Sequence, residues 1–98
     1  MGLTKRETHS EILDRLHLIW VKKNAKYGDS ATATYKKFGL LSYVIRINDK
    51  FMRFQSLVKN PDSAEDDDDE SITDTLLDMA NYAIMAVMDI ETERQDAS

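Results

Sequence analysis

The scarcity of residues that interrupt helices constrains this chain more than any other feature. Its 98 residues include one proline, Pro61, and three glycines, Gly2, Gly28 and Gly39. Helix interiors tolerate these two residue types least, so each segment between them can continue as one helix. Runs of β-branched residues, which favour strands, are few. The sequence therefore predicts an all-α fold.

Apolar residues at helical spacing divide the chain into three main helices and one short helix. The expected ranges are about 8 or 10 to 26, 31 to 38, 40 to 59 and 69 to 93. Gly28 and Gly39 end the first two, because glycine readily adopts the left-handed conformation at a helix end. Residues 61–69 are expected to form an acidic loop and residues 94–98 a short disordered tail, within a single helical domain of residues 1–98.

The last helix predicts a partner subunit. Its first half is amphipathic, with an expected inner row of Ile72, Leu76, Met79 and Ala83. Its second half, ANYAIMAVM, is apolar nearly all round, and a helix without a polar face is buried on more than one side. Three helices in so small a protomer can hardly surround it. We therefore expect a small helical bundle completed by dimerisation, as a homodimer or a higher homo-oligomer.

Composition excludes several classes of function. There is no cysteine, which excludes disulfides, thiolate chemistry and sulfur-ligated zinc. No apolar run approaches the roughly 18 residues of a membrane span, and the amino terminus has no signal-peptide pattern. These features predict a cytoplasmic protein without a membrane partner.

The acidity of the chain is local. Residues 65–70, EDDDDE, carry six negative charges, and subtracting these from the net charge of −5 leaves +1 for the remainder. Lysines and arginines are scattered in ones and twos rather than gathered in a stripe. Duplex nucleic acid is therefore not an expected partner.

Three acidic residues, Glu70, Asp74 and Asp78, follow one another at four-residue intervals and share one face of the last helix. Like charges at this spacing destabilise a helix. An acid in the first turn favours the positive end of the helix dipole, which explains Glu70 but not Asp78 in the third turn. Asn81 extends the same polar line. Both a solvated face and a ligand site are compatible with this pattern.

The helix expected over 40–59 carries a charged strip at positions i, i+3, i+4 and i+7: Arg46, Asp49, Lys50 and Arg53. The simple interpretation is a set of ion pairs on an exposed face, such as Asp49 with Arg53. In the second interpretation the strip lies opposite the acids of the last helix, because two helices joined by a loop pack antiparallel.

The two patterns together predict a Mg²⁺–phosphate site. Carboxylates supply the oxygen ligands that Mg²⁺ prefers, and basic side chains receive phosphate oxygens. The expected metal ligands are Asp49, Asp74 and Asp78, with Glu70 as a further ligand or as the catalytic base that activates water. The expected substrate-binding residues are Arg46, Lys50 and Arg53, with Asn81 beside them.

The stretch KNAKYGDS, residues 23–30, is the third candidate. A glycine-capped helix end followed by a helix N-cap explains it structurally. It also suits a loop that faces a nucleotide, in which Tyr27 stacks on a base and Lys26 contacts a phosphate. Asp29 or Ser30 would then bind a sugar or a base edge. One glycine is too few for a phosphate-cradling loop of the P-loop type.

Three stretches in order, KNAKYGDS, FGLLSYVIRINDKFMR and DESITDTLLDMANYAIM, resemble the nucleotide-modification-associated domain type 1 family. The resemblance covers about residues 20–90. Members of this family are small proteins, often encoded by phages. The resemblance implies a link to modified nucleotides and a place in the cytoplasm of a bacterial host.

The architecture is also similar to the MazG-like all-α nucleotide pyrophosphohydrolases. These enzymes bind Mg²⁺ with a Glu-x-x-Glu pair on one helix and a Glu-x-x-Asp pair on the next. By this resemblance Asp74 and Asp78 belong to the second acid set, and Asp49 stands in the first. The chain departs from that pattern at Arg46 and Lys50, where cations lie among the acids and weaken the expected hold on metal.

Three functions are compatible with these features. The first is a Mg²⁺-dependent nucleotide (pyro)phosphohydrolase that acts in nucleotide modification or salvage. The second is a non-catalytic module that binds or sequesters a nucleotide or a cyclic-nucleotide signal. The third is a structural oligomeric adaptor whose acidic loop contacts a basic partner.

Overall fold

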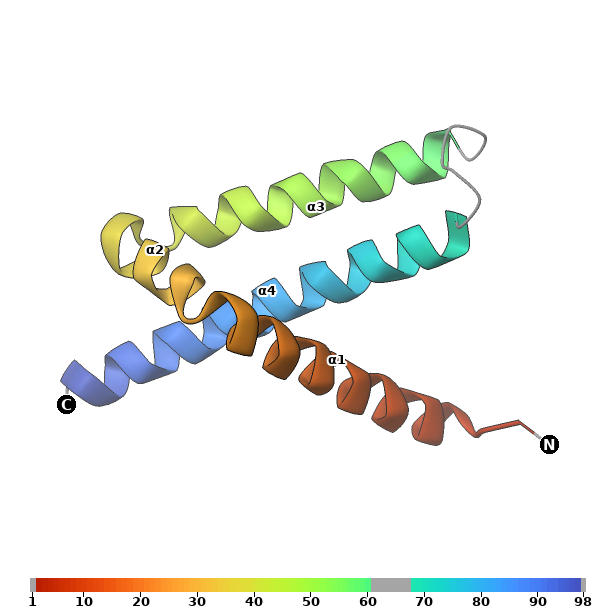
Figure 1. Cartoon of the computed structure of the whole chain (residues 1–98), viewed down its shortest axis with the longest axis horizontal. Helices are drawn as coiled ribbons and strands as arrows, with labels where there is room; N and C mark the ends of the chain where they lie inside the picture. Colours follow the sequence, from red (N-terminus) through yellow and green to blue (C-terminus); the bar gives the residue numbers. More distant parts are fainter. Residues whose placement is uncertain (1, 61–67, 98) are drawn as a thin grey trace. The chain divides into compact units, whose positions relative to one another are not determined.

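The computed structural model describes residues 2–60 and 68–97, without the side chains of residues 68–71. Its elements are four α-helices, and the described residues contain no strand: α1 (Lys5–Tyr27), α2 (Ser30–Phe38), α3 (Leu41–Lys59) and α4 (Asp68–Ala97) (Figure 1). The predicted all-α class and the order of three main helices with one short helix are confirmed. None of these helices is both long and apolar enough to cross a membrane.

The chain divides into two compact units, Met1–Ser30 and Ala31–Ser98. In the first unit, α1 begins at Lys5, earlier than the start expected near Thr8 or Ser10. The cause is a capping box: Thr4 Oγ1 accepts from the Glu7 backbone N–H at 3.1 Å, and Glu7 Oε1 accepts from the Thr4 backbone N–H at 3.0 Å. These bonds lower the pKa of Glu7 below its ordinary value.

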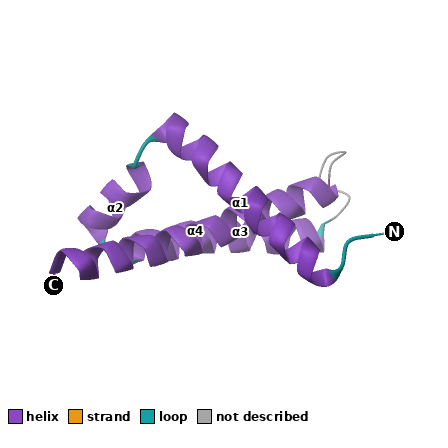
Figure 2. Ribbon diagram, turned by 90° about the horizontal axis from the view of Figure 1, so that it is seen from below, coloured by secondary structure: helices purple, strands orange, loops and turns teal. Residues whose placement is uncertain are grey.

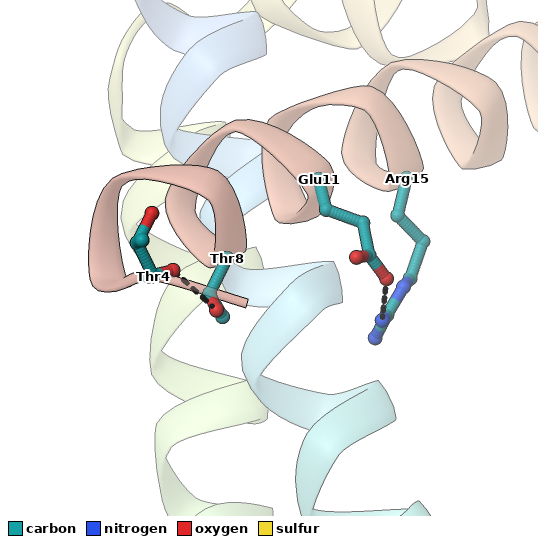
Figure 3. A network of polar contacts seen from close by, with 4 residues as sticks. All are labelled: Thr4, Thr8, Glu11 and Arg15. Carbon is teal, nitrogen blue, oxygen red and sulfur yellow. Dashed lines mark hydrogen bonds and ion pairs between the residues drawn. The ribbon is translucent and has the colours of Figure 1, made fainter. Parts of the chain in front are cut away.

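Two further contacts support the first turns of α1 (Figure 3). The Thr8 hydroxyl donates to the Thr4 carbonyl at 3.0 Å. Glu11 and Arg15 form an exposed i, i+4 ion pair at 3.7 Å, of the kind that contributes a few tenths of a kcal/mol to a helix. The start of the helix is therefore set by its polar residues and not by its apolar stripe.

The predicted glycine ends are confirmed. Gly28 has φ +66° and donates its N–H to the Asn24 carbonyl at 2.7 Å, and Gly39 has φ +73° and donates to the Tyr35 carbonyl at 2.7 Å. A side chain at either position would strain the backbone, because L-residues rarely adopt positive φ.

In the second unit, α3 and α4 lie side by side and run antiparallel (Figures 1 and 2). The helix α3 begins one residue later than expected and ends at Lys59, as expected. Of the predicted acidic loop 61–69, residues 61–67 lie outside the described residues, and the last two, 68 and 69, belong to α4. Residues 94–97, expected in a disordered tail, are also helical, because no glycine or proline interrupts them.

The face that α4 buries differs from the expected inner row. Leu77 is buried, as are two polar neighbours, Thr75 and Asn81, whereas Leu76 is exposed and Ala83 is exposed. Leu76 and Leu77 are adjacent and the second half of the helix is apolar nearly all round, so hydrophobic spacing alone could not select the face that packs on α3. Its exposed apolar residues include Ile84, Val87 and Met88. The predicted second subunit remains a prediction.

Candidate functional site

A line of polar contacts follows the seam between α3 and α4. Lys50 Nζ lies 3.1 Å from Asp78 Oδ2, and the Lys50 and Asp78 side chains are 29% and 22% exposed. Arg46 Nη1 donates to the Tyr82 hydroxyl at 3.5 Å, and the Arg46 guanidinium lies 5.8 Å from the centre of the Tyr82 ring. The two contacts are one helical turn apart on each helix. Because α3 and α4 are antiparallel, Arg46, four residues before Lys50, meets Tyr82, four residues after Asp78.

The structure thus brings Lys50 and Asp78 together directly and places Arg46 on the same seam. Arg53, three residues after Lys50, is exposed, as are Asp49 and Asp74. Asn81 is buried, with 8% exposure, and therefore contributes to the packing of α4. The side chain of Glu70, predicted as ligand or base, lies outside the described residues.

The expected metal set does not assemble from the described residues. Among them, no three histidine or acidic side chains come together in a group that could hold a metal ion. Asp78 instead contacts an ammonium group, which already supplies positive charge to that carboxylate. In this arrangement the acids do not present a free carboxylate set, and the part of Glu70 in such a set stays a prediction.

The KNAKYGDS stretch belongs to the other unit, and we describe it by itself. Lys26 Nζ lies 5.2 Å from the centre of the Tyr27 ring, and Tyr27 is exposed at the end of α1. The Asn24 amide, in the orientation that satisfies its hydrogen bonds, donates to Asp29 Oδ1 at 3.2 Å. Ser30 is the first residue of α2. Tyr27 is thus open to a stacking partner, and its nucleotide contact remains a prediction.

A second polar centre, which sequence reasoning missed, lies where α2 meets α3 and α4. Asp89 accepts hydrogen bonds from the Thr32 hydroxyl at 2.9 Å and from the Tyr43 hydroxyl, and Glu93 accepts one from the Tyr35 hydroxyl. Tyr43 is buried, and its pKa is raised, first by burial and then by its hydrogen bond to Asp89. We call Thr32, Tyr43 and Asp89 the Asp89 hub. The available signal was an acid within an apolar stretch, MAVMDI.

A pocket of about 340 Å³ adjoins the Asp89 hub. Its lining residues are Thr32, Tyr35, Lys36, Gly39, Asp89, Thr92, Glu93 and Asp96. Three carboxylates against one ammonium give this pocket an excess of negative charge, which repels phosphate. An anionic ligand is therefore better accommodated at the seam, where Arg46 and Lys50 lie.

Comparison with known proteins bears on this site. Residues 23–90 match the family described as nucleotide modification associated domain 1. This range includes the KNAKYGDS stretch, the whole of α2 and α3, the polar contacts of the seam and the Asp89 hub. Comparison with curated proteins and with solved structures gave no match. Because the family match covers more than half of the chain, the protein belongs to the nucleotide modification associated domain 1 family.

Proposed function

We propose that this protein binds a nucleotide through its phosphates along the α3–α4 seam. The observation that carries the proposal is the ammonium of the partly exposed Lys50 side chain at 3.1 Å from Asp78, with the Arg46 guanidinium on the same seam. Ammonium and guanidinium groups are the side chains that bind phosphate oxygens most strongly. The description of the family, nucleotide modification associated, supports a nucleotide as the source of the phosphates.

The experiment is a thermal-shift screen of nucleotides, each with Mg²⁺ and with EDTA. A nucleotide at a hundredfold its Kd stabilises the fold by about 2.7 kcal/mol. We expect stabilisation by at least one nucleotide, and a weaker one in the Arg46→Gln variant. Lys59→Gln, which removes an exposed charge at the end of α3, is the matched control. Absence of any shift across the panel would contradict the proposal.

Mg²⁺-dependent hydrolysis is the second candidate. The observation in its favour is the exposure of Asp74, one turn before Asp78 on α4. A bound Mg²⁺ would offset phosphate charge and activate water. Chromatography of the stabilising nucleotide after incubation separates the two functions. Cleaved nucleotide that requires Mg²⁺ supports a hydrolase of nucleotide modification or salvage, and intact nucleotide supports a binding or sequestering module.

The proposal includes self-association in the cytoplasm of a phage-infected bacterial cell. The apolar residues Ile84 and Val87 are exposed on α4, where a second copy could cover them. Sedimentation velocity should give a homodimer or larger species for the wild type and a monomer for Val87→Glu. Ala97→Glu, at the end of the same helix, should leave the assembly unchanged. A monomeric wild type would remove this part of the proposal.

A further inference from the structure

The Lys50–Asp78 ion pair occupies the position at which the two expected ligands, phosphate and a divalent cation, would have to act. Its N–O distance is 3.1 Å, and the Lys50 and Asp78 side chains are 29% and 22% exposed. Partial burial strengthens the pair relative to one on the surface, while the remaining exposure of the Lys50 side chain lets solvent and ligands approach it. Any ligand at this point of the seam therefore meets a pair that is already formed.

A phosphate and a divalent cation would affect this pair in opposite ways. A phosphate oxygen competes with Asp78 for the Lys50 ammonium, because both are anionic acceptors. A divalent cation at Asp78 would lie beside the Lys50 ammonium, and these like charges repel at contact distance. Lys50 thus favours the binding of an anion and opposes the binding of a metal.

The neighbouring groups agree with this assignment. Arg46 contacts the hydroxyl and the ring of Tyr82, neither of which is a carboxylate that would compete with a phosphate. The described residues contain no group of three acidic or histidine side chains that could hold a metal against Lys50. Asp49 and Asp74 are exposed acids on the same two helices. Their carboxylates would not bind a phosphate that carries no metal ion.

We propose that the Lys50 ammonium takes the place of a divalent cation, so that the seam binds a phosphate without a metal ion. Asp78 forms an ion pair with Lys50 when no phosphate is bound, and it competes with phosphate for the ammonium. This inference rests on the proposed nucleotide function and specifies the form in which the ligand binds. It also assigns Asp78 as a positioning residue whose removal tightens binding.

The test uses inorganic tripolyphosphate, which presents the phosphates without a base, in titration calorimetry with EDTA present. Lys50→Gln should lose at least about tenfold in affinity, since it removes a charge-assisted bond, and Lys50→Arg should retain binding. Asp78→Asn should bind about two- to fivefold more tightly, because its ion pair no longer competes. The controls Lys59→Gln and Asp96→Asn should match the wild type. Asp96 lies eighteen residues from Asp78 on α4, about 27 Å along the helix.

A second readout uses Mn²⁺ alone, with free metal followed by electron paramagnetic resonance. Lys50→Gln should bind Mn²⁺ more tightly than the wild type, because the competing ammonium is gone. Helix content by circular dichroism verifies that each variant is folded. Three results would each overturn this inference while leaving the proposed function standing. They are weaker tripolyphosphate binding by Asp78→Asn, a Mg²⁺ requirement for binding by the wild type, and an unchanged Mn²⁺ affinity of Lys50→Gln. Failure of the wild type to bind any nucleotide or tripolyphosphate, with or without Mg²⁺, would overturn the proposed function and this inference with it.

Discussion

Two carboxylates of α4, Asp78 and Asp89, contact α3 within the same unit, but their partners differ in kind. Asp89 accepts hydrogen bonds from two hydroxyl groups, those of Thr32 and Tyr43. Asp78 contacts the ammonium of Lys50. Tyr43 is 3% exposed, whereas Lys50 is half-buried. Both carboxylates are themselves partly buried, so the difference lies in their partners: Asp89 accepts from a buried tyrosine, whereas Asp78 contacts a partly exposed lysine.

This difference separates structural from exchangeable contacts. A buried hydroxyl that loses its acceptor is left without a hydrogen bond and without water, which costs free energy. The hydrogen bonds of the Asp89 hub therefore stabilise the packing of α2, α3 and α4. An ammonium at the edge of the seam can exchange its carboxylate for a ligand phosphate or for water. The same residue type, eleven positions apart on one helix, thus serves two different purposes.

Asp89→Ala should have the largest effect on stability. It leaves the hydroxyls of Thr32 and Tyr43 without their acceptor, and we expect a loss of about 2–4 kcal/mol in the free energy of unfolding. Urea denaturation followed by circular dichroism measures this loss. The control, Asp96→Ala, should stay within about 0.5 kcal/mol of the wild type. Equal effects of the two substitutions would show that the Asp89 hub is not structural.

Alkaline pH should probe the same hub with a smaller effect. Burial and the bond to Asp89 raise the pKa of Tyr43, so the folded state disfavours its ionisation. The contribution of Tyr43 is therefore complete below the ordinary tyrosine pKa of about 10 and is lost as the pH rises above that value. Tyr43→Phe should lose about 1 kcal/mol at neutral pH and decline less steeply at alkaline pH.

The measurement is the urea midpoint as a function of pH for the wild type, Tyr43→Phe and Tyr35→Phe. Tyr35 also has a raised pKa, caused first by its hydrogen bond to Glu93, but it is less buried than Tyr43. It should therefore contribute the smaller share of the alkaline decline. An identical pH profile for the wild type and Tyr43→Phe would show that Tyr43 does not cause the alkaline decline in stability.

The helices of this chain were largely predictable because local residues determine them. Gly28 and Gly39 marked two ends correctly, and apolar spacing defined α3 to within one residue. Apolar periodicity predicts too late a start for α1, because the polar capping box of Thr4 and Glu7 precedes the apolar stripe. Ends set by hydrogen bonds of single side chains are less visible in hydrophobic spacing than ends set by glycine.

The site was predictable only in part. The antiparallel packing of α3 and α4 followed from their connection, and among the described residues it brings one member of the charged strip, Lys50, into contact with one acid, Asp78. Which acid would meet which base depends on the rotation of each helix, and this rotation is set by packing that hydrophobic spacing did not reveal in α4. The Asp89 hub needs a third helix, α2, and contacts across 57 and 46 residues. The acid within MAVMDI is a local signal for a partly buried carboxylate, but it does not indicate these distant partners.

The Lys50–Asp78 pair should give the smallest effect on stability and sharpen the contrast with the Asp89 hub. In a double-mutant cycle with Lys50→Gln and Asp78→Asn, we expect a coupling below about 1 kcal/mol, because solvent screens a partly exposed pair. This coupling should fall further in high salt, whereas the effect of Asp89→Ala should not, since its partners are neutral hydroxyls. A coupling of several kcal/mol, insensitive to salt, would make the pair a structural contact. A weak coupling is what a site needs if phosphate is to take Lys50 from Asp78 without unfolding the seam.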